Sequence, residues 1–237
     1  HQGEVNNVVF SPDGKQIATA SSDKTARLWN VKSGKQLHLL KGHEDGVRSV
    51  VFSPDGKQIA TASSGKTARL WNVESGEQLH ILKGHEDGVW SVVFSPDGKQ
   101  LATASGKTAR LWDVESGEQL HILKGHQGFG FFGDISVVFS PDGKQVATAY
   151  NDGTRLWDVE SGKQLYLIKR RKTLMGTKSL VFSPDGKLLN VGADNTQILR
   201  VGDIEDMLAI SCDWVRHYLE NKPENDEDRY LCDGVGE

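Results

Sequence analysis

The sequence predicts an all-β protein built from repeated four-stranded units. Its clearest signal is the string FSPDGK, which occurs five times, beginning at Phe10, Phe52, Phe94, Phe139 and Phe182. Successive copies are 42, 42, 45 and 43 residues apart, and a period of about 40–45 residues is typical of propeller or solenoid arrays. The chain also has 26 glycines and few long aliphatic runs, which disfavours a helix bundle.

Repeat two shows how the strands are predicted. Residues 47–52, VRSVVF, are rich in β-branched residues, and a Ser-Pro-Asp-Gly turn follows them. We expect further strands over 58–63, 67–73 and 77–83, the last of them half polar, as suits an outer edge. Four short strands cannot bury both faces of their own sheet. Units stacked radially would therefore bury one another's faces.

Two short motifs recur at fixed places in the repeats. Gly-His opens a repeat at Gly42-His43, Gly84-His85 and Gly125-His126, and His1 is a truncated copy. Tryptophan followed by Asn or Asp ends the third strand at Trp29, Trp71, Trp112 and Trp157. These motifs resemble the WD-repeat β-propeller family over residues 1–202. The resemblance implies a propeller, complete or partial, with five recognisable blades, the fifth degenerate.

The resemblance also implies a hydrogen-bond network in each blade, made by a His, a Ser or Thr, an Asp and the Trp. Repeat one matches it with His1, Thr19, Asp23 and Trp29. Repeat two has Gly65 in place of the Asp, repeat three has lost a residue in that turn, and repeat four keeps Asp152. The remaining residues assigned to the network are His43, Trp71, His85, Trp112, His126 and Trp157. A His, a hydroxyl and an Asp also suggest a catalytic triad, but a decaying series of copies favours a structural role.

One side of the repeats varies while the Ser-Pro-Asp-Gly side barely changes. Its variable column is Asn6, Arg48, Trp90, Ile135 and Lys178, which the family resemblance places at the mouth of the central channel. The same side carries an insertion with Phe129, Phe131 and Phe132, which either plugs the channel or meets a partner. Repeat five adds the basic run Lys169, Arg170, Arg171 and Lys172, which suits phosphate, an acidic peptide or plain solvent.

Three further features of the sequence lead to predictions: a set of repeated histidines, the acidic C-terminal segment and the two cysteines. His38, His80 and His121 repeat on separate fourth strands, so we expect exposed edge residues rather than metal ligands. Residues 203–237 hold eleven acidic and three basic side chains and are predicted to form a helical tail, docked on the propeller or free to bind a partner. That tail resembles those of bacterial WD-repeat proteins. Cys212 and Cys232 are expected to be free thiols.

The expected function is a non-enzymatic scaffold that binds a protein or peptide through the variable side. A net charge of -4 argues against a nucleic-acid partner, and no apolar run reaches the ~18 residues of a membrane span. We expect no cofactor and a cytoplasmic location. The alternatives are a regulatory segment of a larger bacterial signalling ATPase and an enzyme with a channel-mouth site. Unpaired strand edges would also favour self-association.

Overall fold

The structure is a computed structural model that describes residues 1–126, 135–169, 177–184, 186–192 and 196–200. These residues form nineteen strands in five antiparallel sheets, so the predicted all-β fold is confirmed. None of the described segments forms a helix with the length and apolar character that crossing a bilayer requires. The predicted acidic tail, with Cys212 and Cys232, lies outside the described residues.

Each of the first four repeats forms one four-stranded blade, and the fifth forms a three-stranded one. Blade 1 holds β1 (Val5–Phe10), β2 (Gln16–Ser21), β3 (Ala26–Asn30) and β4 (Gln36–Leu40). Blade 2 holds β5 (Val47–Phe52), β6 (Gln58–Ser63), β7 (Ala68–Asn72) and β8 (Gln78–Leu82). Blade 3 holds β9 (Val89–Phe94), β10 (Gln100–Ser105), β11 (Thr108–Asp113) and β12 (Gln119–Lys124).

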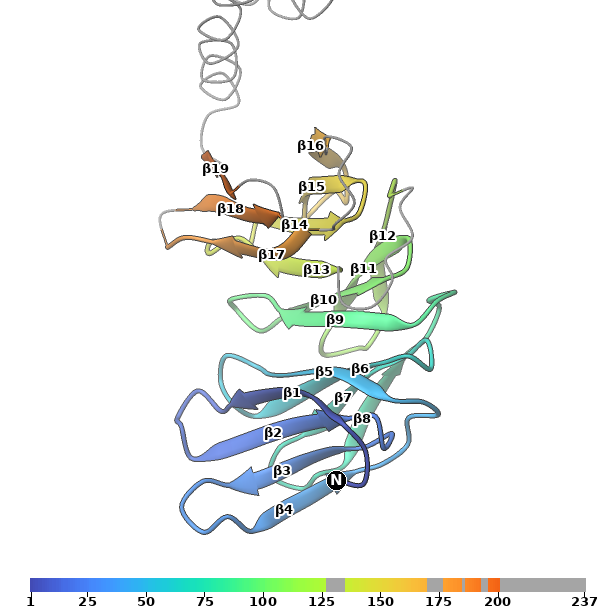
Figure 1. The fold of residues 1–237 in the computed structure, drawn as a ribbon, viewed down its shortest axis with the longest axis vertical. Coiled ribbons are helices and arrows are strands. Elements are labelled where there is room, and N and C mark those ends of the chain that lie inside the picture. The colour runs from blue at the N-terminus through green and yellow to red at the C-terminus, as the bar shows by residue number, and fades with distance from the viewer. Residues whose placement is uncertain (127–134, 170–176, 185, 193–195, 201–237) are drawn as a thin grey trace, which may run out of the picture.

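Blade 4 holds β13 (Ser136–Phe139), β14 (Gln145–Tyr150), β15 (Gly153–Asp158) and β16 (Gln164–Lys169). Blade 5 holds β17 (Thr177–Phe182), β18 (Lys187–Gly192) and β19 (Thr196–Arg200). Figure 1 shows the inner strands β1, β5, β9, β13 and β17 following one another in chain order from one end of the array to the other. Among the described strands, β1 and β17 do not pair.

The recurring FSPDGK string forms the same turn in each of the first four repeats. In blade 2, the Ser53 hydroxyl donates to Asp55 Oδ1 at 2.6 Å, and the Lys57 amide donates to the same oxygen at 3.0 Å. Gly56 has a φ of 71°, where a side chain would be strained. The hydrogen bond from Ser53 is the main reason that the pKa of Asp55 is lowered. The turn thus needs Ser, Asp and Gly at these positions, which explains why these residues recur.

The core lies between neighbouring blades rather than within one sheet. We call the two faces of a blade its front face, turned toward the preceding blade, and its rear face, turned toward the next. The rear face of blade 1 and the front face of blade 2 form one buried cluster of Ala18, Ala20, Ala26, Leu28, Leu40, Val47, Val50, Phe52, Ile59, Trp71 and Val73. Equivalent clusters join blades 2 and 3, and blades 3 and 4. Small side chains on the rear face therefore pack against large side chains on the front face of the next blade, as in other close-packed layers.

Candidate functional site: a row of β-bulges

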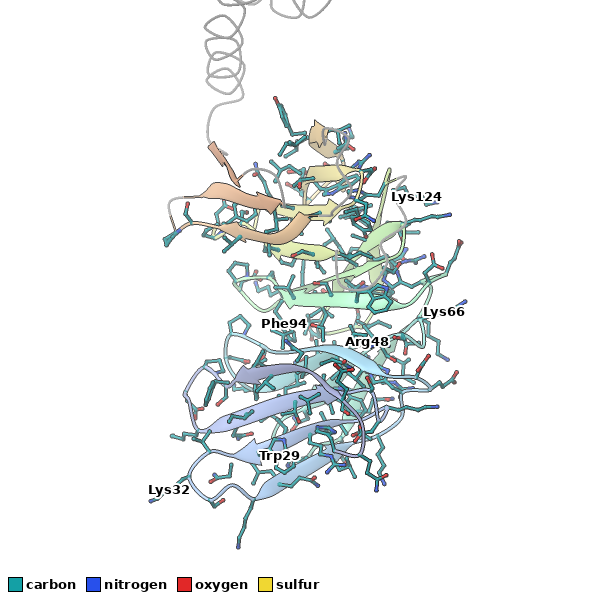
Figure 2. All side chains as sticks on the ribbon, in the orientation of Figure 1. Trp29, Lys32, Arg48, Lys66, Phe94 and Lys124 are labelled. Carbon is teal, nitrogen blue, oxygen red and sulfur yellow. The ribbon has the colours of Figure 1, made fainter. Side chains whose placement is uncertain are left out.

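The antiparallel sheets place two kinds of loop on opposite sides of the array. The turns after the second strands and the Gly-His connections lie on one side, and the Ser-Pro-Asp-Gly and Ser-Gly turns lie on the other. Figure 2 shows this separation, with Lys66 and Lys124 on the first side and Lys32 on the second. Arg48 lies toward the side of Lys66. The sequence prediction that the variable column shares one side is consistent with this arrangement.

Four of the five column positions are β-bulges. Pairing of β1 with β2 shifts between Val5 and Asn7, which leaves Asn6 as the extra residue. The same shift leaves Arg48 extra in β5, Trp90 extra in β9 and Lys178 extra in β17. A bulge residue escapes the strict alternation of a strand, so its side chain is aimed by the local kink instead of by the core. Sequence reasoning found the column but not this cause.

Arg48 and Trp90 lie together across blades 2 and 3. The Arg48 guanidinium carbon is 5.1 Å from the centroid of the Trp90 ring, within the range of a cation–π contact. The Arg48 Nε donates to the Ser64 hydroxyl at 2.7 Å, which fixes the guanidinium over the ring. Trp90 in turn packs against the apolar cluster shared by blades 3 and 4. The pair is therefore held in place before any partner arrives.

Asn6 has a structural task at its bulge. Its amide Nδ2 donates to the Val47 carbonyl at 2.8 Å and to the Ser22 hydroxyl at 3.1 Å. The neighbouring Asn7 accepts a hydrogen bond from the Val50 amide at 3.0 Å. These bonds join the inner strands of blades 1 and 2. Asn6 is therefore half-buried and already engaged within the array.

Ile135 is an exception in the predicted column, because it lies in the core. It is only 6% exposed and belongs to the apolar cluster between blades 3 and 4. β13 begins at Ser136 and pairs with β14 without a register shift, so Ile135 has no bulge to turn it outward. Its side chain instead occupies the core. In the described structure it does not belong to an exposed binding surface.

Only some of the other predicted contact residues lie among the residues that the structure describes. Lys178 lies at the β17 bulge, and Lys169 ends β16. The phenylalanines Phe129, Phe131 and Phe132 lie outside the described residues, as do Arg170, Arg171 and Lys172. Their binding roles remain predictions.

The blade network is present in all four four-stranded blades. In blade 1, His1 contacts Asp23 at 2.8 Å and Thr19 at 2.7 Å, and Trp29 Nε1 donates to the Thr19 hydroxyl at 2.9 Å. The His–Thr–Trp part repeats in the other three blades with distances of 2.7–2.9 Å. The Thr and Trp groups of blades 2 and 3 therefore keep their partners although the Asp is missing there.

Replacement partners explain why the network survives. In blade 4, His126 Nδ1 contacts Asp152 at 2.7 Å, as the sequence predicts. In blade 3, where the turn is shortened, the Ser105 hydroxyl contacts His85 Nδ1 at 2.8 Å. In blade 2, the Thr67 hydroxyl lies 3.3 Å from His43 Nδ1. The hydroxyl groups of Ser105 and Thr67 thus take the place of the missing carboxylates in blades 3 and 2.

Burial governs the chemistry of these histidines. It lowers the pKa of His43 and of His85 to about 3, and the pKa of His126 to about 4. The hydrogen bond that His126 donates to Asp152 opposes this lowering of its pKa. The hydroxyl-bearing residues Thr61, Thr103 and Thr148 are 0% exposed and accept from a tryptophan. A substrate cannot reach these hydroxyls, so the arrangement serves structure rather than nucleophilic catalysis.

The outer-strand histidines join neighbouring blades. His80 Nε2 lies 2.9 Å from the Glu115 carbonyl of blade 3, and His121 Nε2 lies 2.9 Å from the Glu160 carbonyl of blade 4. A Cβ on Gly117 would lie 2.7 Å from the His80 ring, so the turn glycine makes room for the histidine. The expectation of exposed edge residues was therefore wrong, because these half-buried side chains bridge successive blades.

Comparison with known proteins agrees with the fold. The family described as the first β-propeller of IFT122 matches residues 4–127, just over half of the chain, and the WD domain, G-beta repeat, matches residues 117–158. Notchless protein homolog of Arabidopsis thaliana is 56% identical over 43 residues, which cover 18% of this chain and 9% of that protein.

Two further Arabidopsis thaliana proteins match over similar lengths. The guanine nucleotide-binding protein subunit beta is 46% identical over 46 residues, covering 19% of this chain and 12% of the relative. The target of rapamycin complex subunit LST8-1 is 46% identical over 44 residues, covering 19% of this chain and 14% of the relative. The chain thus aligns with about one repeat of each relative. Taken with its bladed fold and the family match over half its length, the chain belongs to the WD-repeat β-propeller family.

Proposed function

We propose that the chain is a non-enzymatic interaction module that binds a protein or peptide through the side carrying the bulge row. The observation that carries the proposal is the preformed Arg48–Trp90 pair, which lies at matching bulge positions of two nearly identical repeats. Arginine and tryptophan are enriched among the residues that dominate binding energy at protein interfaces. Two relatives are named as subunits, of a guanine nucleotide-binding protein and of the target of rapamycin complex, which supports a role in assembly.

The geometry suggests what this pair recognises. Arg48 uses Nε for its bond to Ser64, and in the described part of the chain its terminal amino groups make no hydrogen bond. A guanidinium held in this way presents two parallel donors to a carboxylate. The adjoining Trp90 ring offers apolar area at a small cost in side-chain entropy. We therefore favour a partner segment that places an acidic side chain next to an apolar one.

The test is affinity capture with the purified chain followed by identification of the bound proteins and measurement of one Kd. Arg48→Ala and Trp90→Ala should each weaken binding by about 30-fold, and together by up to about 700-fold, since hot-spot residues each contribute about 2 kcal/mol. Lys32→Ala with Glu74→Ala, on turns of the opposite side, is the matched control and should bind normally. Thermal melts should confirm that both variants fold. Unchanged binding by the folded Arg48/Trp90 variant would refute this placement of the site.

A further inference from the structure

Aspartate followed by glycine recurs in this chain, and such a pair can rearrange without an enzyme. The glycine amide nitrogen attacks the side-chain carbon Cγ of the aspartic acid and forms a C–N bond. The carboxyl group loses its hydroxyl, which leaves with the amide proton as water. Water then opens the resulting succinimide at either carbonyl and gives aspartate or isoaspartate. The rate at each pair depends on how closely the fold brings the nitrogen to Cγ.

The Asp45–Gly46 pair, in the connection before β5, has this approach already made. The Gly46 amide donates to Asp45 Oδ1 at 2.7 Å, so the nitrogen lies beside the carbon that carries this oxygen. Reacting atoms about 3–3.5 Å apart are the starting geometry of efficient intramolecular reactions. Glycine has no Cβ to obstruct the approach. Asp45 is exposed, so water can reach the carboxyl group and open the succinimide.

The Ser-Pro-Asp-Gly turns hold the same two groups apart. In blade 2, the Gly56 amide donates to the Ser53 carbonyl at 2.9 Å, while Asp55 Oδ1 accepts from the Ser53 hydroxyl and the Lys57 amide. The corresponding turns at Asp13, Asp97 and Asp142 make the same bonds. Since nitrogen and carboxyl group each have another partner, we expect these pairs to react slowly.

Repeat three supplies a pair with the same sequence neighbours. The string GHEDGV occurs at 42–47 and at 84–89, so the local sequence gives Asp45 and Asp87 the same reactivity. In the structure, however, the Asp87 carboxylate lies against the shortened turn of blade 3, where a Cβ on Gly106 would be 2.7 Å from its Oδ2. In the longer turn of blade 2, the atom nearest to a Cβ on Gly65 is the Asp45 amide nitrogen, at 3.2 Å. The turn length therefore accompanies a different direction of the carboxylate.

We propose that Asp45–Gly46 is a site of spontaneous isoaspartate formation in the folded protein, and that its geometry favours it over Asp87–Gly88 and over the Ser-Pro-Asp-Gly turns. Isoaspartate lengthens the main chain by one methylene group. It also turns the Asp45 carbonyl, which accepts from the Ser63 hydroxyl at 2.8 Å, into part of a free carboxylate.

The modification would change the surroundings of Arg48. A Cβ on Gly46 would lie 3.8 Å from the Arg48 guanidinium carbon, so the lengthened connection and its new carboxylate would lie close to this bulge residue. The surface of the proposed function would therefore be altered. The rearrangement itself does not depend on that function, and it is tested separately.

The experiment follows both pairs in one protein. The full chain is kept for several weeks at pH 7, either folded or unfolded in guanidinium chloride. Trypsin then releases the pairs in separate peptides, residues 42–48 and 84–99, and electron-transfer fragmentation assigns isoaspartate to a position. Deletion of Ser64 gives blade 2 the shorter turn of blade 3 and is the structural control. Asp45→Glu removes the reacting pair, and thermal melts verify that both variants fold.

In the folded chain, isoaspartate should form at Asp45 at least about tenfold faster than at Asp87, since a misplacement of about 1 Å can slow a reaction about 100-fold. In guanidinium chloride the two rates should be equal. Deletion of Ser64 should lower the rate at Asp45 to that at Asp87, and Asp45→Glu should abolish the signal at this position. Equal rates in the folded chain, or a faster rate at Asp87, would overturn the proposal. Isoaspartate at Asp45 in the unfolded chain alone would also overturn it, because the fold would then protect the pair.

Discussion

Acidification from pH 7 to pH 5 is expected to destabilise the fold through three buried histidines. Burial holds the pKa of His43 and of His85 at about 3 and the pKa of His126 at about 4. In the unfolded chain a histidine has a pKa near 6.5. Below pH 6.5 the unfolded state therefore binds protons that the folded state does not bind. Stability is present above that pH and is lost as the pH falls toward the folded values.

The size of the loss follows from these values. Each pH unit below 6.5 lowers the free energy of unfolding by about 1.4 kcal/mol per histidine. At pH 5 the loss is therefore about 2 kcal/mol for each histidine and about 6 kcal/mol for the three. The figure does not depend on the folded pKa, as long as that pKa lies well below 5. The turn carboxylates, such as Asp55, have a pKa below the ordinary value of 3.8, so their own loss begins only at more acidic pH. The window from pH 7 to pH 5 therefore isolates the histidines.

Urea unfolding at pH 7, 6 and 5, followed by far-ultraviolet circular dichroism, measures this loss. His85→Asn should reduce stability at pH 7 but should also reduce the change between pH 7 and pH 5 by about one third, since one of three titrating groups is gone. The native chain is the control. A total loss below about 2 kcal/mol, or a pH dependence that His85→Asn leaves unchanged, would contradict burial of neutral histidines.

Five substitutions test the packing, each by urea unfolding. Thr103→Val should lower the free energy of unfolding by about 2–5 kcal/mol, because it leaves the buried His85 and Trp112 without their hydrogen-bond partner. Thr19→Val should lower it clearly less, because Thr19 is only half-buried. Phe52→Ala should cost about 3–5 kcal/mol and Phe10→Ala under about 1 kcal/mol, and equal costs would mean that blade 1 is covered. Gly117→Ala should cost about 1–3 kcal/mol, because φ is 71° and the new Cβ would meet an imidazole.

The strands could be predicted from sequence because the repeats can be aligned with one another, so that each repeat supports the strand boundaries of the others. The expected strands of repeat two, over 47–52, 58–63, 67–73 and 77–83, correspond to β5, β6, β7 and β8 within one or two residues. The period, the turn chemistry and the alternation of residues all agree on the same boundaries. Local signals of this kind are consistent with the global fold, which is the condition for reading a fold from sequence.

Details that depend on one inserted or deleted residue could not be predicted. The shortened turn of blade 3 brings Ser105 to His85, whereas the equivalent Ser63 of blade 2 donates to the Asp45 and Gly46 carbonyls. The bulges at Arg48 and Trp90 and the lack of one at Ile135 depend on strand register, which the aligned letters do not reveal. A column of aligned residues therefore contained both partly exposed side chains and one core side chain.

The bulges also explain why that column varies between otherwise similar repeats. Front and rear faces must fit each other at every interface of the array, so a change there destabilises two blades at once. A bulge residue lies outside this constraint, because the extra residue has no paired partner in the ladder. Arg48 and Trp90 can therefore differ between repeats whose packing residues are the same apart from the change of Ile59 to Leu101. In such an array, the interblade faces fix the assembly and the bulge row is free to vary, as its proposed role in binding requires.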